Sequence, residues 1–327
     1  NHTIRAVNLV ERVVTTAAGT GAQGYQRAIS GAAREVPLSS PWDVELGDND
    51  ILYIAMAGTH QLWQLRLDVG VVESLVGSGR EGLLDGPFAE AQLAQPSGLY
   101  YRDGVLYFAD SESSSIRAAD IHTQTVTTLA GPAVNNLFEF GDVDGAVGVS
   151  RLQHALGVVG GADGVLYVAD TYNSKIKRLD PGQRDITTLF GLGGLGDFRD
   201  GGAADAAFDE PGGLDYANGR LYVADTNNHA IRVIDLAAST VSTVTFPNPA
   251  ALQIGERVTV VGGNAAQGEH LTLPEQVIAG GQGWIVLNII LPDGYKLNAL
   301  APFTAEWTTS GEAVTLDDAS RKQRMVA

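Results

Sequence analysis

The chain has no cysteine, few lysines and no long apolar run among its 327 residues. Without cysteine, this stretch forms no disulfide, thiolate metal site or iron–sulfur cluster and carries no thiol redox chemistry of its own. No window approaches the roughly 18 apolar residues that a membrane-spanning helix needs, so we expect no membrane partner. The sequence leaves two cellular compartments open, the cytoplasm and an extracytoplasmic location, and we favour the cytoplasm.

Positive charge is also in deficit. The 21 Lys and Arg residues face 38 Asp and Glu residues, which gives a formal net charge of −17 at pH 7. Sequence-independent affinity for nucleic acid comes from Lys and Arg side chains that displace counterions from phosphates. We therefore expect no nucleic-acid partner.

The residues that are abundant favour a globular β protein. Apolar residues make up 44% of the chain and charged residues only 18%, so a large core can form. The 40 glycines favour many tight turns between short strands over long helices. We expect an all-β fold.

A Leu-Tyr pair followed by an Ala-Asp pair recurs along the chain and defines an internal repeat. The copies occupy residues 51–56, 105–110, 165–170 and 220–225. After each copy, a polar turn leads to an Ile-Arg-like strand and then, in most copies, to a Thr-Thr-Leu-like strand. Four short strands per unit, in series, are typical of propeller blades.

The segment Asn227-Asn228-His229-Ala230-Ile231-Arg232, with a partial copy at Asn1-His2-Thr3-Ile4-Arg5, resembles the signature of NHL repeats. The resemblance implies an NHL-type β-propeller over residues 1–246. Four whole blades are expected at about 40–79, 95–131, 152–191 and 210–246, and residues 1–18 resemble the outer half of another. Because NHL propellers commonly close with six blades, the resemblance implies that about one and a half blades lie upstream.

Beyond the repeats, residues 247–250 read as a linker and 251–327 as a small β-sandwich-like domain, which is expected to be cut short. Strands are expected at 256–261 and 283–290, whereas 320–324 looks unlike a strand. Residues 291–298, Leu-Pro-Asp-Gly-Tyr-Lys-Leu-Asn, are similar to the C-terminal β domain of the thioredoxin-domain NHL-repeat proteins. That resemblance implies a thioredoxin-like domain upstream and a thiol–disulfide oxidoreductase as the whole protein.

Charged residues recur once per blade where the second strand ends, in the inter-blade loops and on the third strand. Because these positions fall on the loop-rich face of a propeller, they form a candidate binding face for a protein or peptide. Its residues are Asp85, Asp110, Asp144, Asp170, Asp200, Asp225, Arg117, Lys177 and Arg232. The alternative is that each aspartate holds its own turn, because Asp side chains accept bonds from nearby backbone amides. We favour that structural alternative.

A metal site is a second alternative. Glu45 and Asp215 share a register on the innermost strands, and His60 and His229 share the signature position. Propeller lyases bind zinc through histidines, and lactonase-like propellers bind a divalent ion through carboxylates. Zinc or calcium is therefore the alternative cofactor, although the histidines lie away from the propeller axis.

These patterns favour a non-catalytic interaction platform without a cofactor. No nucleophile elbow, zinc-protease motif or phosphate loop occurs in a suitable context. The competing hypothesis is a metal-dependent lyase or lactonase-type hydrolase. The sequence leaves the partner and the oligomeric state open.

Overall fold

The computed structural model describes residues 2–133, 135–194, 196–247, 303–306 and 322–325. Its contacts divide the chain into two units, Asn1–Thr245 and Phe246–Ala327. Within the described residues no helix is long and apolar enough to cross a membrane.

In the second unit the structure describes two strands. These are β23 (Phe303–Glu306) and β24 (Lys322–Met325), which pair antiparallel. The expectation that residues 320–324 form no strand was therefore wrong, because most of that segment lies in β24. The strands predicted at 256–261 and 283–290, and the family-like segment 291–298, lie outside the described residues.

The first unit consists of four five-stranded sheets and one two-stranded sheet. We name the complete sheets blades 1 to 4 in chain order and the two-stranded sheet the half-blade. The half-blade contains β1 (Ile4–Asn8) and β2 (Val13–Ala18). Blade 1 contains β3 (Ser30–Ala32), β4 (Pro41–Leu46), β5 (Ile51–Met56), β6 (Gln61–Arg66) and β7 (Val71–Val76).

The other blades repeat this order. Blade 2 contains β8 (Gly86–Pro87), β9 (Pro96–Arg102), β10 (Val105–Asp110), β11 (Ser115–Asp120) and β12 (Thr125–Ala130). Blade 3 contains β13 (Gly145–Ala146), β14 (Gly157–Gly160), β15 (Leu166–Asp170), β16 (Lys175–Asp180) and β17 (Asp185–Phe190). Blade 4 contains β18 (Gly201–Gly202), β19 (Pro211–Ala217), β20 (Arg220–Asp225), β21 (Ala230–Asp235) and β22 (Thr240–Thr243).

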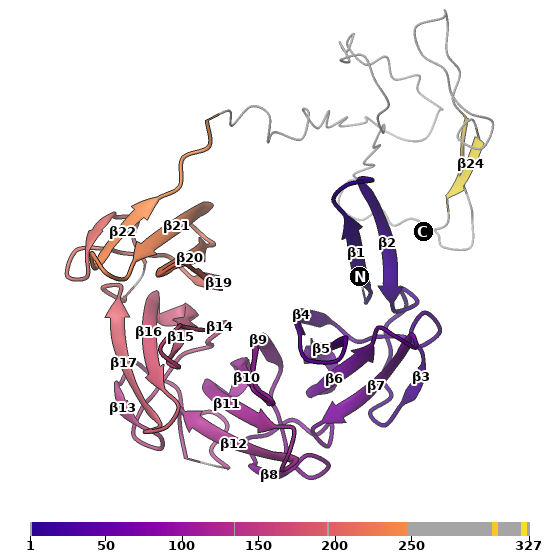
Figure 1. Ribbon diagram of the computed structural model, residues 1–327, viewed down its shortest axis with the longest axis horizontal. Coiled ribbons are helices and arrows are strands. Elements are labelled where there is room, and N and C mark those ends of the chain that lie inside the picture. Colours follow the sequence, from indigo (N-terminus) through magenta and orange to yellow (C-terminus); the bar gives the residue numbers. More distant parts are fainter. Residues whose placement is uncertain (1, 134, 195, 248–302, 307–321, 326–327) are drawn as a thin grey trace, which may run out of the picture. The chain divides into compact units, whose positions relative to one another are not determined.

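The blades are ordered as in a propeller. Within each one the strands pair antiparallel, and the innermost strands β4, β9, β14 and β19 contact one another from blade to blade. Figure 1 shows these four strands innermost in their blades. The prediction of an all-β, NHL-type propeller with about four and a half blades is confirmed.

Each blade has one strand more than the sequence predicted. A strand of two or three residues, taken from the loop before the blade, pairs with the outermost strand. In blade 2 Gly86 pairs with Val126, and in blade 3 Gly145 pairs with Ile186. The Asp-Gly pairs of the long loops therefore lie at the sheet edge rather than in free turns.

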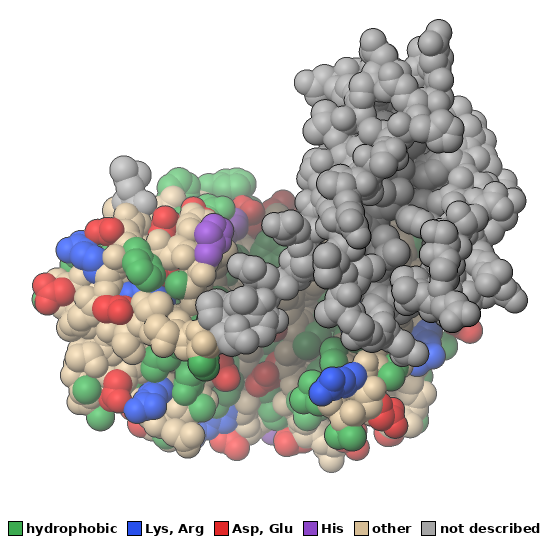
Figure 2. Space-filling view, turned by 90° about the horizontal axis from the view of Figure 1, so that it is seen from above, with side chains coloured by type: hydrophobic (Ala, Val, Ile, Leu, Met, Phe, Trp, Pro, Cys, Tyr) green, Lys and Arg blue, Asp and Glu red, His purple; other side chains and the backbone are tan. Residues whose placement is uncertain are grey.

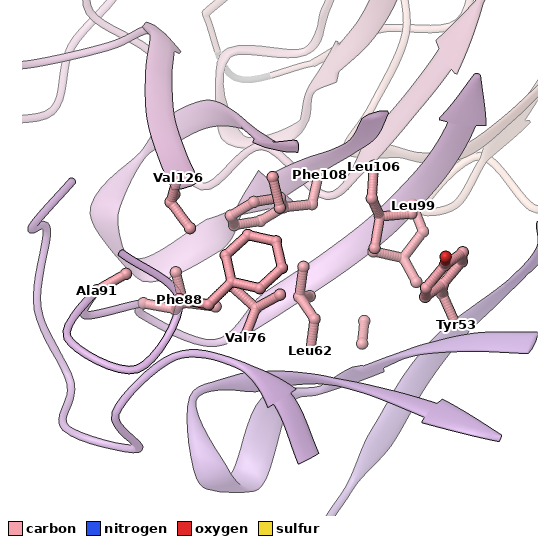
Figure 3. Packing of buried hydrophobic residues seen from close by; sticks show 12 residues of the cluster. Tyr53, Leu62, Val76, Phe88, Ala91, Leu99, Leu106, Phe108 and Val126 are labelled. Carbon is pink, nitrogen blue, oxygen red and sulfur yellow. The ribbon is translucent and has the colours of Figure 1, made fainter. Parts of the chain in front are cut away.

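The core lies between neighbouring blades. Where blades 1 and 2 meet, the aromatic rings Phe88 and Phe108 and the aliphatic side chains Leu62, Leu99 and Leu106 form one buried cluster (Figure 3). Side chains alternate between the two faces of a strand, so the central strands of each blade contribute to two such clusters. Burial of apolar surface between blades therefore holds neighbouring blades together and also stabilises each individual blade.

We predict that Phe108→Ala lowers the free energy of unfolding by about 3–5 kcal/mol, because it leaves a cavity in this cluster. The Phe108 side chain is fully buried, whereas Leu67 on the β6–β7 turn is 46% exposed. Leu67→Ala is the control and should change stability by less than about 0.5 kcal/mol. Urea denaturation followed by circular dichroism measures both, and equal losses would contradict this account of the core.

Candidate functional site

Arg117 of blade 2 lies inside the blade between two carboxylates. Its Nη1 donates to Asp110 Oδ2 at 2.8 Å and its Nη2 donates to Asp85 Oδ1 at 3.0 Å. The same two nitrogens donate to the backbone carbonyls of Gln92 and Leu84. The side chains of Arg117 and Asp110 are fully buried. We call such a set of one cation and two aspartates a cation triad.

Blade 4 repeats the triad. Arg232 Nη1 donates to Asp225 Oδ2 at 2.6 Å and Nη2 to Asp200 Oδ1 at 2.8 Å. The guanidinium also lies 4.6 Å from the ring centroid of Phe198 and 5.2 Å from that of Phe208. Because a buried charge is costly unless it is paired, these contacts are what permit arginine at this position.

In blade 3 the cation is a lysine, and Asp142 joins the triad of Lys177, Asp144 and Asp170 as an additional carboxylate. Lys177 Nζ lies 2.9 Å from Asp144 Oδ1, 3.1 Å from Asp142 Oδ1 and 3.4 Å from Asp170 Oδ2. An ammonium group has fewer donors than a guanidinium, and Asn173 Nδ2 supplies a further bond to Asp170 Oδ2 at 2.8 Å. Burial raises the pKa of Asp170 to about 6, and the opposing attraction of Lys177 is smaller.

The aspartates of each triad also tie distant backbone segments together. The second-strand carboxylates Asp110, Asp170 and Asp225 accept from the backbone amides of residues 94, 153 and 209 at 2.7–2.8 Å. In blade 2, Asp85 of the loop accepts from the Thr128 amide on the outermost strand at 2.8 Å. Each triad therefore locks a loop, a second strand and an outer strand into one unit.

This geometry corrects the candidate binding face. Six of its nine residues are buried and bond to their own blade, so they do not reach a partner: Asp110, Asp170, Asp225, Arg117, Lys177 and Arg232. The loop aspartates Asp85, Asp144 and Asp200 keep 23%, 41% and 49% of their side-chain surface exposed. The structural alternative was also incomplete, because these aspartates bond across tens of residues rather than within a turn.

Blade 1 contains an apolar version of the triad. By strand register, Met56 replaces Asp110, Trp63 replaces Arg117 and Ser30 replaces Asp85. Met56 and Trp63 are buried, and Met56 Sδ lies 3.2 Å from the Ser39 amide where an aspartate oxygen would otherwise accept. The same scaffold thus tolerates either a paired charge or an apolar pair.

The signature histidine position links each blade to the next. The residue there has a left-handed backbone, with φ between 49° and 54° at His60, Ser114 and Ser174. His60 Nδ1 accepts from the Gln95 amide at 3.3 Å, and Ser114 Oγ accepts from the His154 amide at 3.1 Å. We call this bond the inter-blade clasp. His229 occupies the same position in blade 4, with φ of 50°.

The innermost strands line a cavity of about 470 Å³ that contains the other metal candidates, Glu45 and Asp215. Glu45 Oε1 accepts from the Tyr101 amide at 3.1 Å, and the neighbouring Asp43 Oδ2 accepts from the Leu99 amide at 2.8 Å. Burial raises the pKa of Glu45, and the charges of Asp43 and Asp215 raise it further. Glu45 therefore serves as an acceptor that joins blade 1 to blade 2.

The metal hypothesis does not fit this geometry. Among the described residues, no three His, Cys, Asp or Glu side chains converge as metal ligands. His60 already uses Nδ1 in the inter-blade clasp, and Glu45 uses one oxygen for the Tyr101 amide. From the residues that the structure describes, a zinc or calcium ion would not gain the three or more protein ligands that such sites have.

Comparison with known proteins agrees with the fold. Residues 208–234 match the NHL repeat family. The chain is 37% identical to NHL repeat-containing protein 2 of Gallus gallus over 359 residues, covering 96% of this chain and 49% of the relative. It is 40% identical to Protein SUPPRESSOR OF QUENCHING 1, chloroplastic, of Arabidopsis thaliana over 316 residues, covering 91% of this chain and 29% of the relative. The chain contains an NHL repeat and is an NHL-type β-propeller.

The chain spans less than half the length of these relatives. Among solved structures it resembles a putative phosphatase from Bacteroides thetaiotaomicron, with a TM-score of 0.46 and 14% identity over 75% of this chain and 67% of the other. A streptogramin B lyase has a TM-score of 0.43 and 10% identity over 75% and 76%. Likeness at this level carries no information about activity.

We predict that Arg117→Met costs about 3–5 kcal/mol of stability, because it leaves Asp110 buried without its cation. Copying blade 1 into blade 2 with Asp85→Ser, Asp110→Met and Arg117→Trp should recover most of that loss, to within about 2 kcal/mol of the natural protein. Trp63→Arg is the reciprocal control and should destabilise, since it buries an unpaired charge. Urea denaturation measures all three, and a triple variant as unstable as Arg117→Met would disprove the equivalence.

We also predict a pH effect at blade 3. The pKa of Asp170 is raised on folding from its usual 3.8 to about 6. The folded state therefore holds this proton more tightly, and the resulting stabilisation is lost as pH rises from about 4 to 6. Relative to Asp170→Asn, the natural protein should lose at most about 1.4 kcal/mol per pH unit in this window and then level off. Unfolding at pH 4, 5, 6 and 7 measures the difference, and a flat difference would contradict the raised pKa.

Proposed function

We propose that this NHL propeller is a non-catalytic platform that binds a protein or peptide partner. The observation that supports the proposal is the separation of scaffold from surface. Repeated charges are used inside the blades, whereas the long loops that depart from the repeat present exposed apolar side chains. Among these are Phe138 at 78% and Phe140 at 61%. A rigid scaffold that displays variable loops is the usual design of a binding protein.

The charge distribution also supports a protein partner over nucleic acid. Two arginines and one lysine of the described part are fully buried within triads. On the face seen in Figure 2, Lys and Arg side chains are interspersed with acidic and hydrophobic ones rather than gathered in one basic area. Protein interfaces tolerate such a mixed surface, while binding to phosphates requires clustered positive charge.

We further propose that the platform gives specificity to a thiol–disulfide enzyme of which this chain is one part. Two considerations support this. The matched relatives are more than twice as long as the region shared with this chain. Residues 291–298 resemble the C-terminal domain of thioredoxin-domain NHL-repeat proteins. Since this chain has no cysteine, the reactive thiols would belong to another part of the protein.

Photo-cross-linking tests the platform. The chain is produced with a photoreactive phenylalanine analogue at Phe138, at Tyr25 of the loop before blade 1 or at Leu67, in three separate samples, and each is irradiated in a lysate of its source cells. We expect specific protein adducts from Phe138 and none from Leu67, because Leu67 lies on the β6–β7 turn at the other end of its blade. Mass spectrometry identifies the adducts. The absence of protein adducts from any loop position would overturn the platform.

A further inference from the structure

The loop between blades 2 and 3 departs from the repeat. Twelve residues separate Gly131 from Asp144, whereas seven separate Gly77 from Asp85 and eight separate Gly191 from Asp200 in the equivalent loops. Ten residues separate Gly19 from Ser30 in the loop before blade 1, so the loop between blades 2 and 3 is the longest of these four. Binding sites in repeat proteins commonly lie at such insertions, because a per-repeat insertion maps to a loop on one face.

The described part of this loop is held in place by bonds to both neighbouring blades. The Asn135 amide donates to the Leu83 carbonyl at 2.7 Å, which ties the loop to the segment before blade 2. Asn173 Nδ2 donates to the Gly141 carbonyl at 2.7 Å, which ties it to the η3 turn of blade 3 (Thr171–Asn173). Glu139 pairs with Arg151. The loop is thus anchored on each side of Phe138 and Phe140.

These two rings form an aromatic site together with Tyr172, for which we use the name loop-aromatic site. Phe138 is 78% exposed, Phe140 61% and Tyr172 48%. Tyr172 precedes Asn173, whose side-chain amide donates to the carbonyl next to Phe140, so the segments that carry Tyr172 and Phe140 adjoin each other. The Tyr172 ring stacks on His154 at 4.6 Å between centroids, which fixes its orientation.

The charge that remains exposed beside these rings is negative. Glu112 and Glu139 keep 36% and 37% of their side-chain surface exposed. The neighbouring cations are more deeply buried and already paired: Arg151, at 18%, bonds Glu139 and three backbone carbonyls, and Lys175, at 15%, bonds Asp142. A partner therefore meets aromatic faces bordered by carboxylates.

We propose that the loop-aromatic site binds an extended protein segment that carries Lys or Arg next to apolar side chains. A cation over an aromatic face is attracted to its π electrons, and a partner cation near Tyr172 is also attracted to Glu112, which lies beside His154 under that ring. The apolar side chains of the partner segment then pack on Phe138 and Phe140. The proposal rests on the platform function proposed above and adds the chemistry of the partner.

Selection from a phage-displayed library of random dodecapeptides tests the proposal with the full chain. We expect enrichment of peptides with Lys or Arg beside apolar residues. In fluorescence anisotropy the most enriched peptide should bind Phe138→Ala/Phe140→Ala at least about tenfold more weakly, as for central residues of an interface. Leu67→Ala/Val69→Ala removes two exposed apolar side chains from the β6–β7 turn and should leave affinity unchanged. Added salt should weaken binding.

Three results would overturn the proposal: no enrichment, enrichment of acidic peptides, or binding that survives Phe138→Ala/Phe140→Ala. The proposal would also be overturned if a labelled single-stranded RNA bound more tightly than the enriched peptide and if that binding required Phe138 and Phe140. All four residues are exposed, so thermal unfolding of the variants should match the natural protein. The cross-linking experiment distinguishes failure of this proposal from failure of the proposed platform function. Partner adducts at other loops but not at Phe138 would support the platform function and contradict binding at the loop-aromatic site.

Discussion

The buried cation of each triad is the interaction on which the loop face depends. Removing a guanidinium from water is costly, and the cost is offset only when several acceptors surround it. Arg117 and Arg232 each donate to two carboxylates and two carbonyls, and only Nε lacks a partner among the described atoms. One carboxylate comes from the second strand and the other from the preceding loop. If the loop left the sheet, the buried cation would therefore lose one of its two carboxylate partners.

Much of the fold could be predicted from the sequence, since strand periodicity and turn residues are local signals. The repeated Leu-Tyr and Ala-Asp pairs located β5, β10, β15 and β20 correctly. The short fifth strand could not be predicted in the same way, because two residues such as Gly86 and Pro87 carry no periodicity. The expectation for 320–324 failed because charged residues are poor indicators of a strand, whereas pairing with β23 decides its conformation.

The candidate site was harder to predict, because a sequence shows charge but not burial. Asp85 and Arg117 are 32 residues apart, and only the closed blade brings them to 3.0 Å. One signal was nevertheless present: where the aspartate position reads Met56, the arginine position reads Trp63. The simultaneous loss of both charges in one repeat indicates that they contact each other. The exposed rings of Phe138 and Phe140 follow from an insertion, which repeat comparison also reveals.

The mixed chemistry of the blades has a consequence for the order in which they melt in acid. Blades 2, 3 and 4 each hold a cation between carboxylates that can take up a proton, whereas Met56 and Trp63 in blade 1 have no proton to gain. Acid therefore leaves the Met56–Trp63 pair unchanged, whereas in blades 3 and 4 it protonates Asp144 and Asp200, whose pKa is lowered because their hydrogen bonds and ion pairs outweigh burial, and so loosens the loop locks there.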